Sequence, residues 1–180
     1  MRVITAPEEY ALKDGDISVF LAGGIMNCPD WREGVIKNLE FMIRGDELVI
    51  FNPLRKNFPM DDPSASQKQI EWEYKALERC DIFSMYFSNG ISDQPICMYE
   101  LGRNIVRMQM KYPLDWRDRV LISVEHGYKR KQDVLIQTEL ACGNLFINTV
   151  GSEEQNPSVK RYHSIMIAEA YKKFSNRVHK

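Results

Sequence analysis

Short runs of apolar residues recur five times along the chain, and each run ends in glycine, proline, asparagine or a group of polar residues. A continuous apolar run between turn residues is typical of a strand that is buried on both faces. The side chains of these runs are rich in the β-branched and aromatic types that strands favour. The pattern predicts strands at residues 16–21, 47–51, 81–87, 119–124 and 145–150.

The segments between the runs carry apolar residues three or four positions apart, which is the spacing of one face of a helix. Asp30 is placed to cap the first helix, and Ser66 with Gln69 fits a capping box at the start of the second. Pro95 suits the first position of the third helix, and Gly143 the end of the fourth. The predicted helices are 31–43, 66–79, a segment that begins at 95, 132–142 and 159–178.

This alternation of strands and helices predicts the fold. It is the pattern of an α/β protein with an open, mostly parallel sheet and helices on both faces, a flavodoxin-like or Rossmann-like sandwich. We expect five strands in the order 2-1-3-4-5, for which the ligand crevice lies between strands one and three, beyond their carboxyl ends. That crevice would bring Gly23 and Gly24, after strand one, close to Glu100, after strand three.

Composition narrows the range of functions. The chain has 180 residues with 44% apolar and 27% charged side chains, which suits one domain over residues 1–180. Its net charge of −1 gives no electrostatic case for a nucleic acid polymer or a membrane surface, and no apolar run is long enough to span a bilayer. The start lacks the apolar core of a signal peptide.

Cysteine and histidine usage adds two expectations. The four cysteines are scattered and form no C-x-x-C pair, so we expect reduced, mostly buried thiols in a cytoplasmic protein. The three histidines are far apart in the sequence, and we therefore predict no metal site.

Glu100 and Glu73 are the residues that point to chemistry. Glu100 follows the start of a helix, directly after a strand and its loop, where the helix dipole is expected to favour the ionised carboxylate. Such a carboxylate is a nucleophile or a cap. Glu73 falls on the apolar stripe formed by Ile70, Tyr74 and Leu77, which we expect to be buried, so it is either functional or paired, for example with Arg79.

The loops at the same sheet edge offer further candidates, each with two interpretations. Gly23-Gly24 lets a ligand approach the backbone or simply makes a tight turn, and it matches neither a dinucleotide fingerprint nor a Walker phosphate loop. Arg55 and Phe58, with Lys56 between them, could hold a phosphate or stack on a base, or could form a solvated loop. Asp93, next to Gln94, could cap the helix or bind substrate.

Several short motifs occur in order and together resemble one known family. The motifs are F-L-A-G-G at 20–24, D-W-R at 30–32, N-P-L-R at 52–55, Q-I-E-W-E at 69–73 and Y-E-L-G at 99–102. The chain is similar to the nucleoside 2-deoxyribosyltransferase family, in particular to its nucleoside 2-deoxyribosyltransferase-like branch, over about residues 17–140. The C-terminal helix lies outside the resemblance.

The resemblance implies a mechanism and a set of partners. Glu100 matches the family nucleophile, which attacks the anomeric carbon of 2-deoxyribose, expels the base and forms a covalent intermediate that a second base resolves. Glu73 matches the position that binds the base. Asp133 matches a position that completes the site of a neighbouring subunit, which implies a homo-oligomer. The implied substrates are nucleosides and nucleobases, in a salvage role, with no metal or organic cofactor.

The chain departs from the better-known branch at two positions. Phe20 stands where that branch has a tyrosine that orients the nucleophile, and Tyr86 and Tyr99 are the candidates to supply that hydroxyl instead. Gln94 stands where that branch has an aspartate that holds the sugar hydroxyls, with Asp93 beside it. Deoxyribose transfer is our first hypothesis.

Two alternatives accompany it. One is a hydrolase of the same N-glycosidic bond, acting on nucleosides or on their 5′-monophosphates, which Arg32, Arg55 and Lys56 motivate. The other is a nucleotide-binding or sensing domain without turnover.

Overall fold

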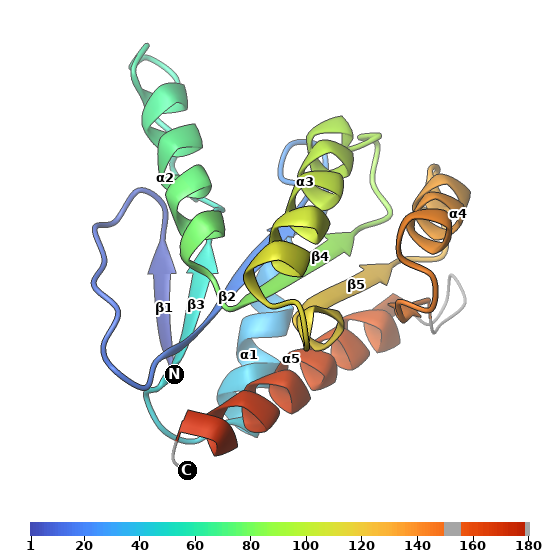
Figure 1. Ribbon diagram of the computed structural model, residues 1–180. Helices are drawn as coiled ribbons and strands as arrows, with labels where there is room; N and C mark the ends of the chain where they lie inside the picture. The colour runs from blue at the N-terminus through green and yellow to red at the C-terminus, as the bar shows by residue number, and fades with distance from the viewer. Residues whose placement is uncertain (150–155, 179–180) are drawn as a thin grey trace.

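One parallel sheet lies between two layers of helices in the computed structural model, which describes residues 1–149 and 156–178 (Figure 1). The strands are β1 (Arg2–Thr5), β2 (Ile17–Gly23), β3 (Leu48–Asn52), β4 (Ile82–Phe87), β5 (Val120–Val124) and β6 (Ile147–Asn148). The helices are α1 (Arg32–Met42), α2 (Ala65–Arg79), α3 (Pro95–Lys111), a short 3₁₀ turn η1 (Trp116–Asp118), α4 (Lys131–Cys142) and α5 (Asn156–Val178).

The strand order is β1-β3-β2-β4-β5-β6, and every pair is parallel. The predicted fold class is confirmed, and the five predicted strands lie in the predicted 2-1-3-4-5 order. The expected count of five was wrong, because β1 adds a sixth strand at the edge beside β3, from Arg2 opposite Val49 to Thr5 opposite Asn52. Its side chains are mostly half-buried, so it lacks the continuous apolar run that marked the others.

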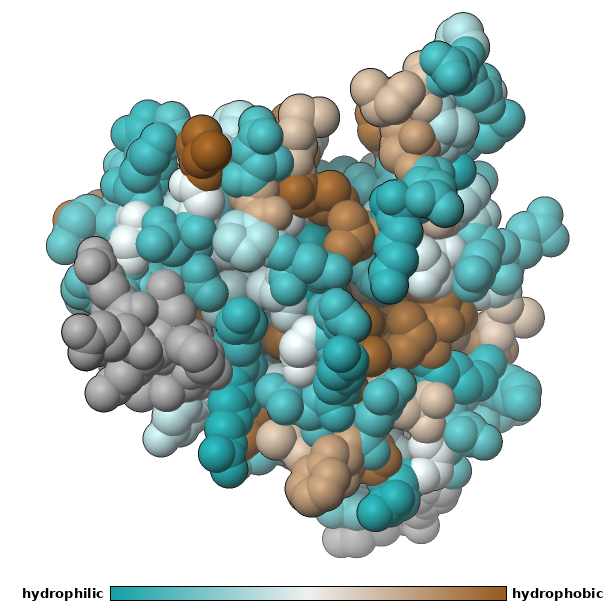
Figure 2. Space-filling view, turned by 180° about the vertical axis from the view of Figure 1, so that it is seen from behind, coloured by the Kyte–Doolittle hydropathy of each residue, from teal (hydrophilic) through white to brown (hydrophobic). Residues whose placement is uncertain are grey.

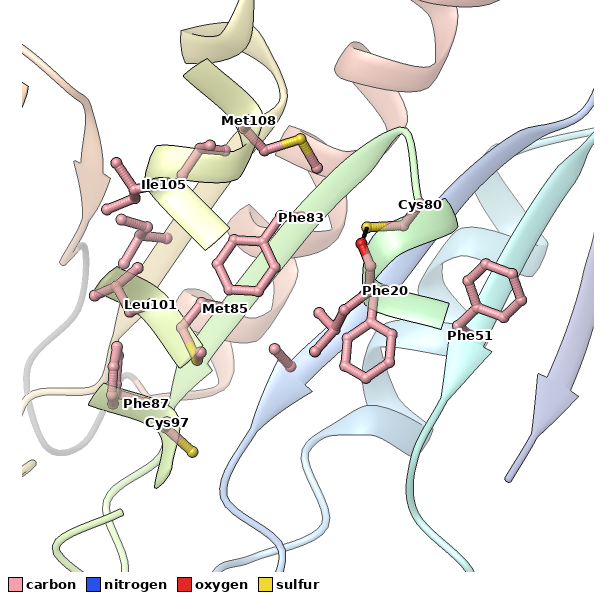
Figure 3. Packing of buried hydrophobic residues seen from close by; sticks show 14 of the residues in the cluster. Phe20, Phe51, Cys80, Phe83, Met85, Phe87, Cys97, Leu101, Ile105 and Met108 are labelled. Atoms are coloured by element: carbon pink, nitrogen blue, oxygen red, sulfur yellow. Dashed lines mark hydrogen bonds between the residues drawn. The ribbon is translucent and has the colours of Figure 1, made fainter. Parts of the chain in front are cut away.

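Each face of the sheet has its own core, because successive side chains of a strand point to opposite faces. On one face, α2, α3 and α4 cover Phe20, Phe83 and Met85, and Figure 3 shows α3 side chains packed onto β4 there. On the other face, α1 and α5 cover Val19 and Leu21. Burial on both faces explains why these strands are apolar at nearly every position.

The start of α2 differs from the prediction. The helix begins at Ala65, so Ser66 lies inside it and the predicted capping box is wrong. The Asp62 carboxylate instead accepts hydrogen bonds from the amide and hydroxyl of Ser64, at 2.8 and 2.7 Å. The Gln69 side chain turns toward the sheet edge, where it donates to the Pro53 carbonyl.

The expected buried stripe on α2 is also wrong. Ile70 and Tyr74 are 65% and 53% exposed, whereas Trp72 and Ala76 pack on the sheet together with Leu77. Helical spacing identified an apolar face but not what covers it. Two boundaries near the C-terminus also differ from the prediction. Strand β6 is shorter than predicted, and the last predicted strand residue, Val150, lies outside the described residues. Helix α5 begins three residues before the predicted start at 159.

The four cysteines are free thiols, with Cys80, Cys97 and Cys142 buried and Cys28 half-buried. This agrees with the expectation of reduced, mostly buried cysteines. Among the described helices, none is long and apolar enough to cross a membrane.

Candidate active site

A pocket of about 220 Å³ opens at the carboxyl edge of the sheet, between the ends of β2 and β4. The loops after these strands form its floor, and α2 and α3 form its walls. Figure 2 shows the molecule notched at this edge, beside the projecting N-terminal end of α2. Five residues proposed from the sequence line this pocket together: Gly23, Gly24, Glu73, Gln94 and Glu100.

Close packing explains the two glycines. Gly23 has φ +150°, and a Cβ there would collide with the Tyr86 carbonyl oxygen and lie 2.8 Å from the Trp31 ring. A Cβ on Gly24 would collide with the Cys28 sulfur. The tight-turn interpretation therefore accounts for both positions, and it leaves the backbone of the loop exposed to the pocket.

Arg32 holds this loop from behind. Its buried guanidinium donates hydrogen bonds to the carbonyls of Leu21 at 3.0 Å, Gly23 at 2.6 Å and Gly24 at 3.0 Å. Burial lowers its pKa to about 10. No carboxylate among the described residues pairs directly with it, but Glu73 and Glu100 are close enough to favour its charged form. Because its donors bind backbone carbonyls, Arg32 is not the phosphate ligand considered from the sequence.

Gln94 ties the two pocket loops together. Its backbone is left-handed, with φ 51°, and its side chain is buried. The side-chain oxygen accepts from the Gly24 amide at 3.1 Å, and the nitrogen donates to the Ser88 carbonyl at 2.8 Å. Asp93 does not cap α3; its carboxylate points outward to Lys129, 3.8 Å away.

Glu100 and Glu73 face the pocket from different helices. The pKa of Glu100 is raised to about 7, first by burial and then by the nearby Glu73, and Arg103 and Arg32 oppose the rise. Glu100 is the sixth residue of α3, beyond the first turn where the helix dipole acts, so the expectation of a carboxylate held ionised by the dipole is wrong.

Glu73 is held by α2 itself. Its carboxylate accepts a hydrogen bond of 2.7 Å from Gln69, not an ion pair from Arg79. Burial raises the pKa of Glu73, while the Gln69 hydrogen bond and the Arg32 charge oppose that rise. Two carboxyl groups that both resist ionisation therefore share one small pocket.

The remaining sequence candidates lie outside the pocket of this chain. Arg55 stacks over Phe58, with the guanidinium carbon 5.3 Å from the ring centre, in the loop after β3. Asp133 lies in the first turn of α4, paired with Arg130 at 3.3 Å. Asp93 likewise does not line the pocket.

The missing family tyrosine has no evident replacement. Phe20, which has no hydroxyl, lines the pocket. The Tyr86 hydroxyl donates to the buried Glu125 at 2.7 Å, and the Tyr99 side chain is 66% exposed. Neither hydroxyl is hydrogen-bonded to Glu100 in this structure.

Sequence reasoning missed the apolar part of the pocket. Ile25, Met26, Ile96 and Cys97 line it, and burial raises the pKa of the Cys97 thiol to about 12, so the sulfur stays protonated near neutral pH. In a sequence, apolar residues that line a pocket cannot be distinguished from apolar residues of the core. Among the described residues, no three His, Cys, Asp or Glu side chains are grouped so as to hold a metal ion.

Comparison with known proteins agrees with this geometry. The family model described as "Nucleoside 2-deoxyribosyltransferase like" matches residues 16–112, a segment that includes β2, Glu73 and Glu100. Asp133 and α5 lie outside the matched segment. A search of curated proteins gave no match. Because the family model matches more than half of the chain, this protein belongs to the nucleoside 2-deoxyribosyltransferase-like family.

Proposed function

We propose that the protein transfers 2-deoxyribose between nucleobases, with Glu100 as the nucleophile. The observation that supports this most is the pair of carboxyl groups, Glu100 from α3 and Glu73 from α2, in one pocket at the switch point of the sheet. Glycoside chemistry uses two carboxyl groups in different protonation states, and neighbouring groups with perturbed pKa values supply them.

The proposed reaction has two steps that pass through a glycosyl-enzyme. A Glu100 oxygen bonds to the anomeric carbon as the N-glycosidic bond breaks, and the electron pair of that bond leaves with the base, which takes up a proton. A nitrogen of the second base then attacks the same carbon, gives its proton to the carboxylate that protonated the first base, and releases Glu100. Two inversions at one carbon restore the starting stereochemistry.

Glu73 is the proposed proton donor to the departing base. Burial raises the pKa of both carboxyl groups, and the charge of Glu73 adds to the rise at Glu100. The form with Glu73 protonated and Glu100 ionised provides an acid beside a nucleophile. Glu73 is hydrogen-bonded to Gln69, which fixes its direction.

Hydrolysis of the same bond is the second candidate, because the exposed Met26 and Ile96 leave the mouth of the pocket open to water. Among the described residues, no lysine or arginine lines the pocket, which favours nucleosides over 5′-monophosphates as substrates. We place the activity in nucleoside salvage in the cytoplasm. The family resemblance implies the salvage role, and the free thiols agree with a reducing compartment.

Chromatography of reaction mixtures tests the proposal. Deoxyinosine incubated with free adenine should yield deoxyadenosine, and the Glu100→Ala variant should yield none while keeping the circular dichroism of the wild type. Free hypoxanthine without deoxyadenosine would favour hydrolysis. Exchange that persists in Glu100→Ala would refute the role of Glu100. Inactivity of the wild type on nucleosides and 5′-monophosphates alike would favour a binding domain.

A further inference from the structure

Three charged side chains follow one another on the side of α3 that is nearest α2. Glu100, Arg103 and Arg107 are spaced by three and four residues, which places them along one side of the helix. The Arg103 guanidinium stacks over the Tyr74 ring of α2, 4.9 Å from the ring centre. Arg107 donates to the Glu78 carbonyl of α2 at 3.0 Å. Another side of α3 packs on the sheet (Figure 3), so this row of charges runs along the junction of the two helices and begins at the pocket.

Arg103 has donors that no group of the protein uses. Its Nε and Nη2 atoms are buried, and neither has a hydrogen-bond partner among the described residues. Buried donors without partners are rare, because they have lost their contact with water and gained no acceptor in return. The two atoms form one edge of the guanidinium, which is the fork that binds both oxygens of a carboxylate. Stacking on Tyr74 fixes the plane of this fork but supplies no acceptor of this kind.

The Glu100 carboxylate is an acceptor of matching charge and shape within reach of this fork. Glu100 lies three residues before Arg103 on α3, and side chains at this spacing have Cβ atoms about 5–6 Å apart. No described residue donates a hydrogen bond to the Glu100 carboxylate, although the charge of Arg103 already acts on it. A carboxylate and a guanidinium edge, both without hydrogen-bond partners, therefore lie one helical turn apart beside the pocket.

The other charged and titratable groups around Glu100 are already engaged. Glu73 on α2 is hydrogen-bonded within its own helix, and the Arg32 guanidinium on α1 donates to backbone carbonyls. The Cys97 thiol on α3 stays protonated near neutral pH, because burial raises its pKa to about 12. Of the groups that act on Glu100, Arg103 is thus the cation with donors to spare.

We infer that Arg103 is a positioning residue for the nucleophile, whose free Nε and Nη2 atoms bind the ionised Glu100 carboxylate during the reaction. This inference rests on the proposed role of Glu100 in base exchange. The contact orients the carboxylate for attack and stabilises it again when the second base releases it. Arg103 then supplies the orientation that the better-known branch of the family obtains from a tyrosine, which Phe20 cannot provide in this chain.

Arg103 acts through Glu100 and not on the substrate, because it is not among the residues that line the pocket. Loss of its charge should therefore lower kcat and leave the KM for the nucleoside nearly unchanged. A residue that bound the nucleoside itself would instead change KM.

Carbon-13 NMR of labelled glutamate carboxyl groups tests the contact and requires no enzymatic activity. The Glu100 resonance is identified by its loss in Glu100→Gln, and in the wild type it should titrate near pH 7. In Arg103→Met the midpoint should move to higher pH, because the ionised carboxylate has lost its cation. The fold should persist, checked by circular dichroism, because the substitution removes two buried donors that have no partners.

Two further variants control this titration. Arg103→Lys keeps the charge, so its midpoint should stay closer to that of the wild type than the midpoint of Arg103→Met does. Lys75→Met is the matched control, because Lys75 is an exposed cation of α2 that is not among the groups that shift the pKa of Glu100. Its midpoint should equal that of the wild type.

The pH profile of base exchange tests the role of the contact in the reaction. In Arg103→Met the acidic limb of kcat should move to higher pH, so that the loss of rate is largest at acidic pH, and Arg103→Lys should recover part of that loss. The profile of Lys75→Met should coincide with that of the wild type.

Each other outcome counts against the inference. An unmoved Glu100 midpoint in Arg103→Met, or an equal movement in Lys75→Met, would show that Arg103 does not bind this carboxylate. A midpoint that moves while kcat stays the same would show a contact without a role in the reaction. A raised KM with unchanged kcat would make Arg103 a substrate ligand. A wild type without base exchange would refute the proposed function, whereas the NMR midpoints would still decide whether Arg103 binds Glu100.

Discussion

Replacing Glu100 by Gln should stabilise the folded protein at alkaline pH. The pKa of Glu100 rises from the ordinary 4.5 to about 7 on folding, chiefly because the half-buried side chain loses much of its contact with water. The folded state thus favours the protonated form, and stability is lost as pH rises from the unfolded pKa through the folded one. Glutamine has nearly the same shape and carries no charge at any pH, so it avoids this loss.

The size of the effect follows from the shift. A rise of 2.5 units, from 4.5 to 7, corresponds to about 3 kcal/mol at 1.36 kcal/mol per unit. Glu100→Gln should therefore gain up to about 3 kcal/mol at pH 8 and less than about 0.5 kcal/mol at pH 4.5. For a chain of this length the alkaline gain corresponds to roughly 6–12 °C in Tm.

Urea denaturation at pH 4.5 and pH 8 measures both values, with Glu40→Gln on the exposed side of α1 as the matched control. The control should change stability by less than about 0.5 kcal/mol at either pH. If Glu100→Gln destabilises the protein at pH 8, or gains the same amount at both pH values, then burial does not oppose ionisation of Glu100 and the reasoning fails. Loss of activity together with higher stability is the trade-off expected of a functional site.

Two further predictions concern titration. Glu73→Gln removes the like charge that helps to raise the pKa of Glu100, so the acidic limb of the pH profile for base exchange should move to lower pH, while the overall rate falls because the proposed proton donor is lost. An acidic limb that does not move would show that the Glu73 charge does not act on Glu100. His163 is buried between the Ser84 and Ser123 hydroxyls, at 2.7 and 2.8 Å, and burial lowers its pKa to about 3. Its contribution to stability is present above the unfolded pKa near 6.5 and is lost as pH falls toward 3, so acid unfolding followed by circular dichroism should be less steep in His163→Gln than in the wild type; equal steepness would contradict this.

The strand arrangement could be predicted because continuous apolar runs report burial on both sides of a sheet. The order of five strands, the crevice between β2 and β4, and the meeting of Gly23 with Glu100 all followed from it. Strand β1 escaped detection because an edge strand needs only one partner and stays partly exposed.

The error in the buried stripe of α2 has a physical cause. Helical spacing shows that a face is apolar but not whether the sheet, solvent or another molecule covers it. Spacing alone therefore predicts that Ile70 and Tyr74 are buried, although both are exposed. The sequence also could not predict that Arg32 holds the loop after β2, because its hydrogen-bond partners are backbone carbonyls that only the folded loop brings together.

Detection of a covalent intermediate tests the central claim most directly. The protein is incubated with deoxyinosine but no acceptor base, quenched in acid, digested and analysed by mass spectrometry. The account predicts a deoxyribosyl adduct on the peptide that contains Glu100, absent from Glu100→Gln and removed by adding adenine before the quench. Base exchange that proceeds without any adduct on this peptide, or with an adduct on another residue, would contradict Glu100 as the nucleophile.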